Sequence, residues 1–85
     1  MKWELLLTGP ARKALKRIPA ADRRRVLAAL DAMEQDPFSG DIVRLKAQSV
    51  AWRRRVGDWR ILFDIEREKR RVLVHDVVRR TSTTY

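Results

Sequence analysis

The sequence predicts an α+β fold in which a helical hairpin packs on one face of a four-stranded, mostly antiparallel sheet. Two observations lead to this prediction. Between residues 11 and 33, apolar residues recur at intervals of three and four, which is typical of amphipathic helices. From residue 52 onwards, apolar and polar residues alternate with a period of two, which is typical of strands. The expected order of elements is strand, helix, helix, strand, strand, strand.

The first strand is expected over residues 2–8, where alternate side chains share one face: Trp3, Leu5 and Leu7. A short helix should follow, with Thr8 as its N-cap and Pro10 in its first turn. Its apolar stripe consists of Ala11, Ala14, Leu15 and Ile18. Pro19 ends this helix and opens the next one.

The second helix is expected over residues 22–33. Asp22 suits its positive N-terminal end, and its apolar stripe consists of Val26, Leu27, Leu30 and Met33. Asp36-Pro37 stops the helix, because a residue that precedes proline avoids the helical region. Residues 38–50, which include Ser39-Gly40-Asp41, are expected to form a loop.

A hairpin of two strands is expected next, over residues 52–56 and 59–66, with Gly57-Asp58 as a tight turn. Trp52 and Trp59 have the parity of core residues, as do Ile61 and Phe63. A charged turn over residues 67–70 leads to a last strand over residues 72–78, and a polar tail ends the chain.

The 85 residues should form one domain, because a chain this short supports a single hydrophobic core. The absence of cysteine excludes disulfides and thiolate metal sites, and a single histidine leaves no zinc cluster, so no cofactor or metal is expected. Leu5-Leu6-Leu7 is too short for a signal peptide or a membrane span. The expected location is the cytoplasm, with no membrane partner.

The formal net charge of +9 points to polyanionic partners. Nucleic acid, an acidic protein and anionic lipid would each satisfy this charge. Two helices cover only one side of the sheet, so Arg53, Arg55 and Arg60 should face water on the other side. Three convergent guanidinium groups predict a phosphate-sized anion site, and the alternative is that they only solubilise an exposed sheet.

The hairpin resembles a known sequence pattern. Residues 52–63, Trp-Arg-Arg-Arg-Val-Gly-Asp-Trp-Arg-Ile-Leu-Phe, are similar to the hairpin of the RelE/ParE superfamily of toxins from toxin–antitoxin systems. The helix pair, Asp36-Pro37, Arg44-Leu45-Lys46 and the terminal segment from Arg80 to Tyr85 also follow the family's order. The resemblance implies the RelE-like fold and a bacterial growth-inhibiting toxin neutralised by a co-expressed antitoxin. The net charge of +9 predicts that this antitoxin is acidic.

The superfamily has two functional branches. RelE-like toxins cleave mRNA in the ribosomal A site without a metal, and the RNA 2′-hydroxyl is the nucleophile. ParE-like toxins act on DNA gyrase and have no nuclease activity. A plain basic nucleic-acid binder or an inactive toxin is the third possibility for this chain.

The residues favour the RelE-like branch. By resemblance, its catalytic positions fall on Arg53, Arg55, Arg60, Arg80 and Tyr85. Arg55 and Arg60 would clamp the phosphate, and Arg80 would act on the leaving-group side. Additional RNA contacts are expected from Arg44, Lys46, Arg54 and Arg79.

The general base of the cleavage reaction is not assigned to one residue. Some RelE-like enzymes have Lys where this chain has Arg53 and Arg55, and arginine hardly serves as a base. Tyr85 is the preferred candidate, because neighbouring cations make a phenol more acidic. His75 is the other candidate, but it lies in a valine-rich strand where a structural role is expected.

Overall fold

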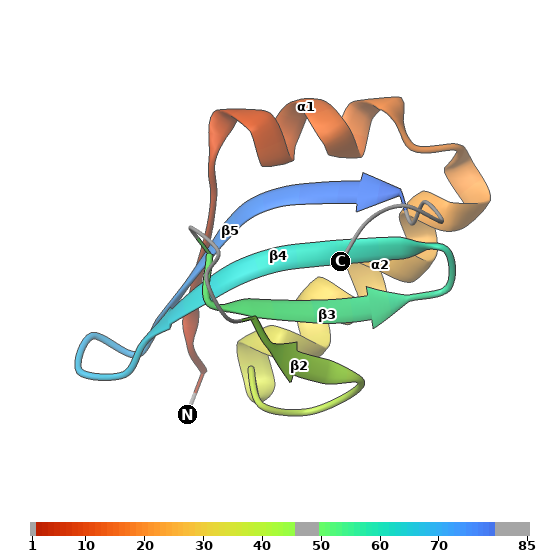
Figure 1. Cartoon of the computed structure of the whole chain (residues 1–85). Helices are drawn as coiled ribbons and strands as arrows, with labels where there is room; N and C mark the ends of the chain where they lie inside the picture. Colours follow the sequence, from red (N-terminus) through yellow and green to blue (C-terminus); the bar gives the residue numbers. More distant parts are fainter. Residues whose placement is uncertain (1, 46–49, 80–85) are drawn as a thin grey trace.

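The computed structural model describes residues 2–45 and 50–79. Along the chain it contains β1 (Glu4–Leu7), α1 (Gly9–Arg17), α2 (Ala20–Gln35), β2 (Ile42–Arg44), β3 (Trp52–Val56), β4 (Trp59–Glu66) and β5 (Arg71–Arg79). The strands form one sheet in the order β1-β5-β4-β3-β2 (Figure 1). Only the β1–β5 pair is parallel, and the other three pairs are antiparallel.

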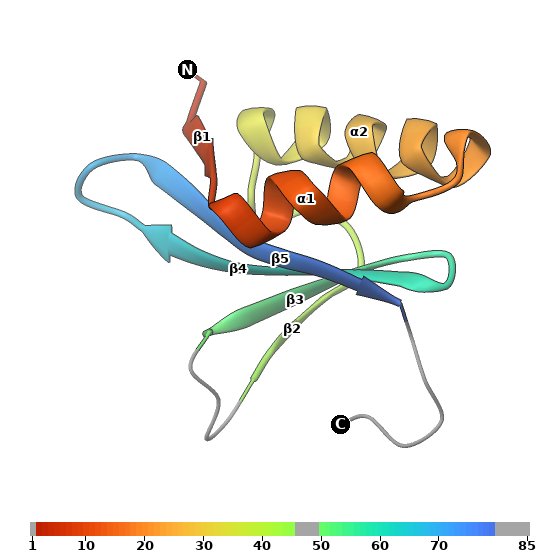
Figure 2. The ribbon, with the colours of Figure 1, turned by 90° about the horizontal axis from the view of Figure 1, so that it is seen from above.

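Both helices lie on the same face of the sheet, as the view from above shows (Figure 2). This arrangement confirms the predicted α+β class and the helical hairpin. The sheet has five strands instead of the predicted four, because β2 forms within the segment that was expected to be a loop. β2 pairs with β3 in the register Ile42↔Arg54 to Arg44↔Trp52. Three residues are too few to show a period of two, so the sequence alone did not reveal this strand.

The helix ends follow the predicted capping chemistry. The Thr8 hydroxyl accepts a hydrogen bond from the Ala11 N–H at 3.3 Å, and a proline occupies the first turn of α1. α2 ends at Gln35, and its C-cap residue Asp36 has an extended backbone directly before Pro37. In the part of the chain that the structure describes, no helix is long and apolar enough to cross a membrane.

The core lies between the helices and the sheet. Phe63, which is fully buried, comes from the central strand β4. The other buried apolar residues form one cluster with it: Ala11, Ile18, Val26, Ala29, Leu30, Met33, Ile61, Val72, Val74 and Val77. Trp52 and Trp59 pack against this cluster, as predicted from their parity. The Trp59 Nε1–H also donates to Asp22 Oδ2 at 3.1 Å, which ties β4 to α2.

β5 contains an irregularity that the sequence analysis did not anticipate. Leu62 pairs with Asp76, whereas the next residue, Phe63, pairs with Val74, so His75 is an extra residue without a partner on β4. This bulge shifts the side-chain alternation by one residue. Val74 and Val77 therefore both face the core, and Asp76 stays out of it.

Candidate functional site

The helices leave one face of the sheet uncovered, here called the open face (Figure 2). The strand register places three arginines on this face. Arg55 on β3 is directly opposite Arg60 on β4, and Arg53 is opposite Leu62. Directly opposed residues have Cβ atoms about 5 Å apart, and like charges placed so repel each other. The strand register therefore places Arg53, Arg55 and Arg60 on one face of the sheet, as predicted. An anion between the guanidinium groups would relieve the repulsion.

The three side chains differ in exposure. Arg55 is exposed and Arg53 is half-buried. Arg60 is only 8% exposed, so the expectation that it faces water was wrong. β4 is the central strand, so Arg60 has a cross-strand neighbour on each side, Arg55 on β3 and Val78 on β5. Among the residues that the structure describes, the Arg53 Nη1 atom is buried and has no hydrogen-bond acceptor, so this donor is unsatisfied.

The additional arginines expected to bind RNA lie on the other side of the sheet. The Arg54 Nη1 atom donates to the Ser39 carbonyl oxygen at 3.0 Å. The Arg44 guanidinium lies 5.6 Å from the centre of the Trp52 ring, and that of Arg79 lies 5.9 Å from the Trp59 ring. These three side chains are thus separated from the open-face arginines. The remaining predicted site residues lie outside the described part of the chain: Lys46, Arg80 and Tyr85.

The open face also carries a histidine–carboxylate pair. The His75 Nε2 atom lies 2.8 Å from Asp64 Oδ2, and the side chains of the two residues are 34% and 30% exposed. Asp64 Oδ1 accepts a hydrogen bond from the Ala51 N–H at 2.7 Å. The pair joins β4 to β5. The sequence analysis did not foresee this contact, because it treated β5 as a regular strand. The change of parity between Val74 and Val77 was the signal that could have revealed the bulge.

Beyond this pair, the open face becomes apolar towards β1. Leu6 is 39% exposed and is paired with Leu73 on β5. At the end of β1, Arg71 Nε donates to Glu4 Oε1 at 2.9 Å. In the described part of the chain, no three side chains of the metal-binding types come together as possible ligands.

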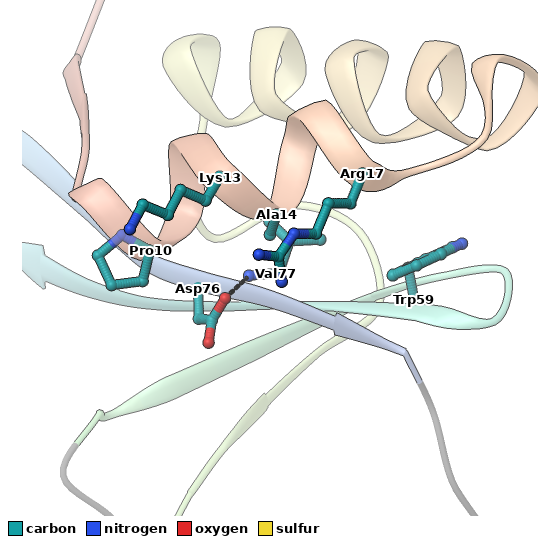
Figure 3. A pocket seen from close by; sticks show the side chains of 7 residues that line it. All are labelled: Pro10, Lys13, Ala14, Arg17, Trp59, Asp76 and Val77. Carbon is teal, nitrogen blue, oxygen red and sulfur yellow. Dashed lines mark hydrogen bonds between the residues drawn. The ribbon is translucent and has the colours of Figure 1, made fainter.

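A groove of about 410 Å³ lies elsewhere, between α1 and the second half of β5 (Figure 3). Arg17 extends from α1 towards Asp76, whereas Lys13 runs over Pro10 (Figure 3). The Asp76 carboxylate accepts a hydrogen bond from the Val77 N–H at 2.8 Å. Trp59 closes one end of the groove. β1 pairs with only the first half of β5, so along this stretch β5 has β4 on one side and no described strand on its outer edge. The groove does not include any of the three open-face arginines.

No protein-family model matches the sequence, and no curated protein matches it either. Solved structures do match. A chain of the archaeal RelE–RelB complex from Pyrococcus horikoshii superposes with a TM-score of 0.83 at 23% identity, covering 98% of this chain and 100% of that one. A chain of the RelBE2 toxin–antitoxin complex from Mycobacterium tuberculosis gives 0.81 at 22% identity, with coverages of 94% and 100%.

A solved structure whose name includes ParE also matches. The YoeB/ParE toxin from Agrobacterium tumefaciens gives a TM-score of 0.74 at 19% identity, and the match covers 92% of this chain and 99% of that one. All three identities are below 25%. The chain therefore has the fold of RelE-type toxins, as the resemblance of its sequence implied.

Proposed function

We propose that this protein is the toxin of a type II toxin–antitoxin pair and that it cleaves mRNA on the ribosome without a metal cofactor. The proposal places it in the cytoplasm, where ribosomes are found. The observation that carries it is the grouping of Arg53, Arg55 and Arg60 on one sheet face of a RelE-type fold. The ribosome would present the mRNA in its A site, and the arginines would bind the phosphate that reacts.

The chemistry of RNA cleavage matches this grouping. Attack of the 2′-hydroxyl on phosphorus builds negative charge on the phosphoryl oxygens and on the leaving 5′-oxygen. Positively charged donors that are fixed before the reaction stabilise this charge without reorganising. Arg55 and Arg60 are opposed across two strands, which suits a clamp on one phosphate. Arg53 would supply its buried, unsatisfied Nη1–H to the same anion.

An acidic, amphipathic segment of an antitoxin is the partner that the open face fits best. The face has a basic end at Arg55 and an apolar end at Leu6 and Leu73. A segment with carboxylates at one end and apolar side chains at the other would satisfy both. The net charge of +9 would accelerate its association.

Inhibition of DNA gyrase is the second candidate function. The structural match to the YoeB/ParE toxin of Agrobacterium tumefaciens supports it. If the protein inhibits gyrase, the same arginines would bind a protein or DNA partner and would not catalyse a reaction. Growth inhibition would then be accompanied by a DNA-damage response and by gyrase-linked DNA cleavage.

A reconstituted translation system separates the two functions. Purified protein is added to translating ribosomes, and mRNA ends are mapped by primer extension, with a ribosome-free reaction alongside. We expect cuts at A-site codons only when ribosomes are present. Arg55→Ala and Arg60→Ala should lower the cleavage rate about 100- to 1,000-fold, as loss of a transition-state donor typically does. Arg24→Ala, which removes the same charge from the exposed side of α2, should leave the rate unchanged.

Folding of each variant is checked by circular dichroism, because Arg60 is largely buried. Intact mRNA from a folded protein that still inhibits growth would contradict the nuclease proposal and favour gyrase.

A further inference from the structure

We propose that His75 is the general base of the ribonuclease reaction and that Asp64 orients its imidazole ring and sets its tautomer. This inference rests on the proposed function, because the group that loses its proton is the 2′-hydroxyl of the RNA. An arginine cannot act as the general base, since a guanidinium stays protonated at every relevant pH. The assignment to His75 needs no residue outside the described part of the chain.

The contact with Asp64 determines which nitrogen of His75 can act. An ionised carboxylate only accepts hydrogen bonds, so Nε2 carries the hydrogen in the 2.8 Å contact with Asp64 Oδ2. The neutral ring then has its lone pair on Nδ1. Among the described residues, Nδ1 has no hydrogen-bond partner, and the side chain is 34% exposed. No described residue therefore competes with a substrate hydroxyl for Nδ1.

Asp64 is itself held in place. Its second carboxylate oxygen accepts the Ala51 N–H at 2.7 Å, so the carboxylate is fixed between β3 and β5. Once His75 takes up a proton, the adjacent carboxylate stabilises the imidazolium. The two residues thus have the arrangement that a histidine base needs: one ring nitrogen oriented by an acid and the other available.

The β-bulge brings His75 to this position. The extra residue interrupts the pairing with β4, and Thr8, which directly follows β1, holds the bulge from the other side. The Thr8 N–H donates to the Val74 carbonyl oxygen at 3.0 Å, and the Thr8 hydroxyl donates to the His75 carbonyl oxygen at 2.7 Å. Bulges often re-aim a side chain next to a functional site.

The pair lies beside the arginines. Arg53 is opposite Leu62, so it is the diagonal neighbour of Asp64 on the open face, and such neighbours are about 7–8 Å apart. Arg53 also stands between the pair and the opposed residues Arg55 and Arg60. A phosphate bound by the Arg53 guanidinium would bring the adjacent ribose 2′-hydroxyl to the side of the face that His75 occupies.

Charged groups from several elements surround His75. On the sheet they are Arg53 on β3, Asp64 and Glu66 on β4, Arg71 and Asp76 on β5, and Glu4 on β1. Glu4 and Glu66 are both engaged by Arg71, at 2.9 and 3.6 Å. From the helical layer, Arg17 extends towards Asp76 across the groove, and Lys13 lines the same groove. Asp64 is the one that touches the imidazole directly.

In the proposed step, two bonds change at phosphorus and one proton moves to His75. Nδ1 of His75 takes the proton of the 2′-hydroxyl while the 2′-oxygen forms a bond to phosphorus. The bond between phosphorus and the 5′-oxygen breaks, and the leaving oxygen takes a proton from water. The products are an RNA end with a 2′,3′-cyclic phosphate and one with a 5′-hydroxyl. His75 then releases its proton to solvent.

The test uses single-turnover cleavage of mRNA on programmed ribosomes, with saturating protein, between pH 6 and 8.5. The wild-type rate should rise with pH, because the base must be deprotonated and imidazoles titrate in this range. His75→Gln preserves a donor for Asp64 but removes the base, so the rate should fall 100- to 10,000-fold and lose this dependence on pH. The protein concentration that gives half-maximal cleavage should not change.

Two further variants separate catalysis from structure. Free imidazole should restore part of the activity of His75→Ala, in proportion to the unprotonated fraction of the imidazole. Asp64→Asn keeps an acceptor for the Ala51 N–H, but its amide donates to Nε2 and forces the hydrogen onto Nδ1. We expect the Asp64→Asn variant to fold and to cleave mRNA more slowly than the wild-type protein.

The outcomes distinguish the two proposals. Intact mRNA with the wild-type protein would overturn both the nuclease function and the base. Wild-type cleavage that His75→Gln matches, with the same dependence on pH, would overturn the base alone and leave the arginine site standing. A folded Asp64→Asn variant at the wild-type rate would also overturn the role of the pair.

Discussion

Arg23 joins the two helices through a single guanidinium group. From the first turns of α2, its Nε and Nη2 atoms donate to the carbonyl oxygens of Leu15, Lys16 and Ile18, at 2.9, 3.0 and 2.9 Å respectively. These carbonyl oxygens are at the C-terminal end of α1, where the helix has no internal donors left for them. The sequence analysis expected only a proline break here. Arg23 is therefore a structural residue and not part of the basic binding surface.

We expect Arg23→Ala to lower the free energy of unfolding by about 1–2 kcal/mol, because three carbonyl groups lose a charged donor. Arg23→Lys should recover only part of this loss, since an ammonium group lacks the planar fork. Urea unfolding measures both. Arg24→Ala, at the exposed next position of the same helix, is the control and should change stability by less than about 0.5 kcal/mol. Equal losses at the two positions would contradict this role of Arg23.

The residues of the candidate site show where sequence reasoning succeeds. Arg53, Arg55 and Arg60 could be assigned to one face, because the period of two is maintained from Trp52 through the hairpin. The burial of Arg60 could not be foreseen, because it depends on the order of strands in the sheet. The contact between His75 and Asp64 joins residues on different strands across a bulge, and alternation within one strand carries no information about it.

The hairpin of β3 and β4 is the element that holds the opposed arginines. Its turn begins at Gly57, whose φ of +58° lies in the region that glycine enters without steric strain. The turn fixes the register in which Val56 faces Trp59 and Arg55 faces Arg60. This part of the fold was predictable, because Gly-Asp between two alternating runs is a strong hairpin signal.

Gly57→Ala should therefore destabilise the protein by about 1–2 kcal/mol, since a Cβ at this φ is strained. The added Cβ would also lie 3.2 Å from the Arg25 Nη1 atom, although that side chain can move. Thermal or urea unfolding tests the effect. Gly9→Ala is the matched control, because a Cβ there meets no atom within 4 Å and its φ is not positive. A Gly57→Ala variant as stable as wild type would mean that the turn does not constrain the hairpin.

Two elements escaped the sequence analysis for different physical reasons. β2 has three residues, and its pairing with β3 is a tertiary contact that local pattern does not encode. β5 was placed correctly to within a residue at each end, but its bulge was missed. A regular strand would have put Asp76 on the core side together with Val74, and the bulge avoids burying that carboxylate.

At the scale of the whole molecule, positive charge is present on both layers. α1 carries four cations and no acidic residue: Arg12, Lys13, Lys16 and Arg17. The open face of the sheet carries the three arginines of the candidate site. A net charge of +9 therefore predicts binding to polyanions without showing which layer binds them. The salt dependence of RNA binding distinguishes the two layers.

We expect the affinity for single-stranded RNA to fall steeply as salt rises, with a slope of log K against log salt of about −0.7 for each phosphate neutralised. Arg55→Ala should make this slope shallower by about 0.7, because Arg55 is the exposed member of the open-face group. Arg12→Ala removes the same charge from the exposed face of α1 and should leave the slope nearly unchanged. Fluorescence anisotropy with a labelled oligonucleotide, between 50 and about 300 mM salt, measures both slopes. If the two variants shifted the slope equally, RNA would be attracted by the charge of the whole protein, and the arginines of the open face would not form a distinct phosphate site.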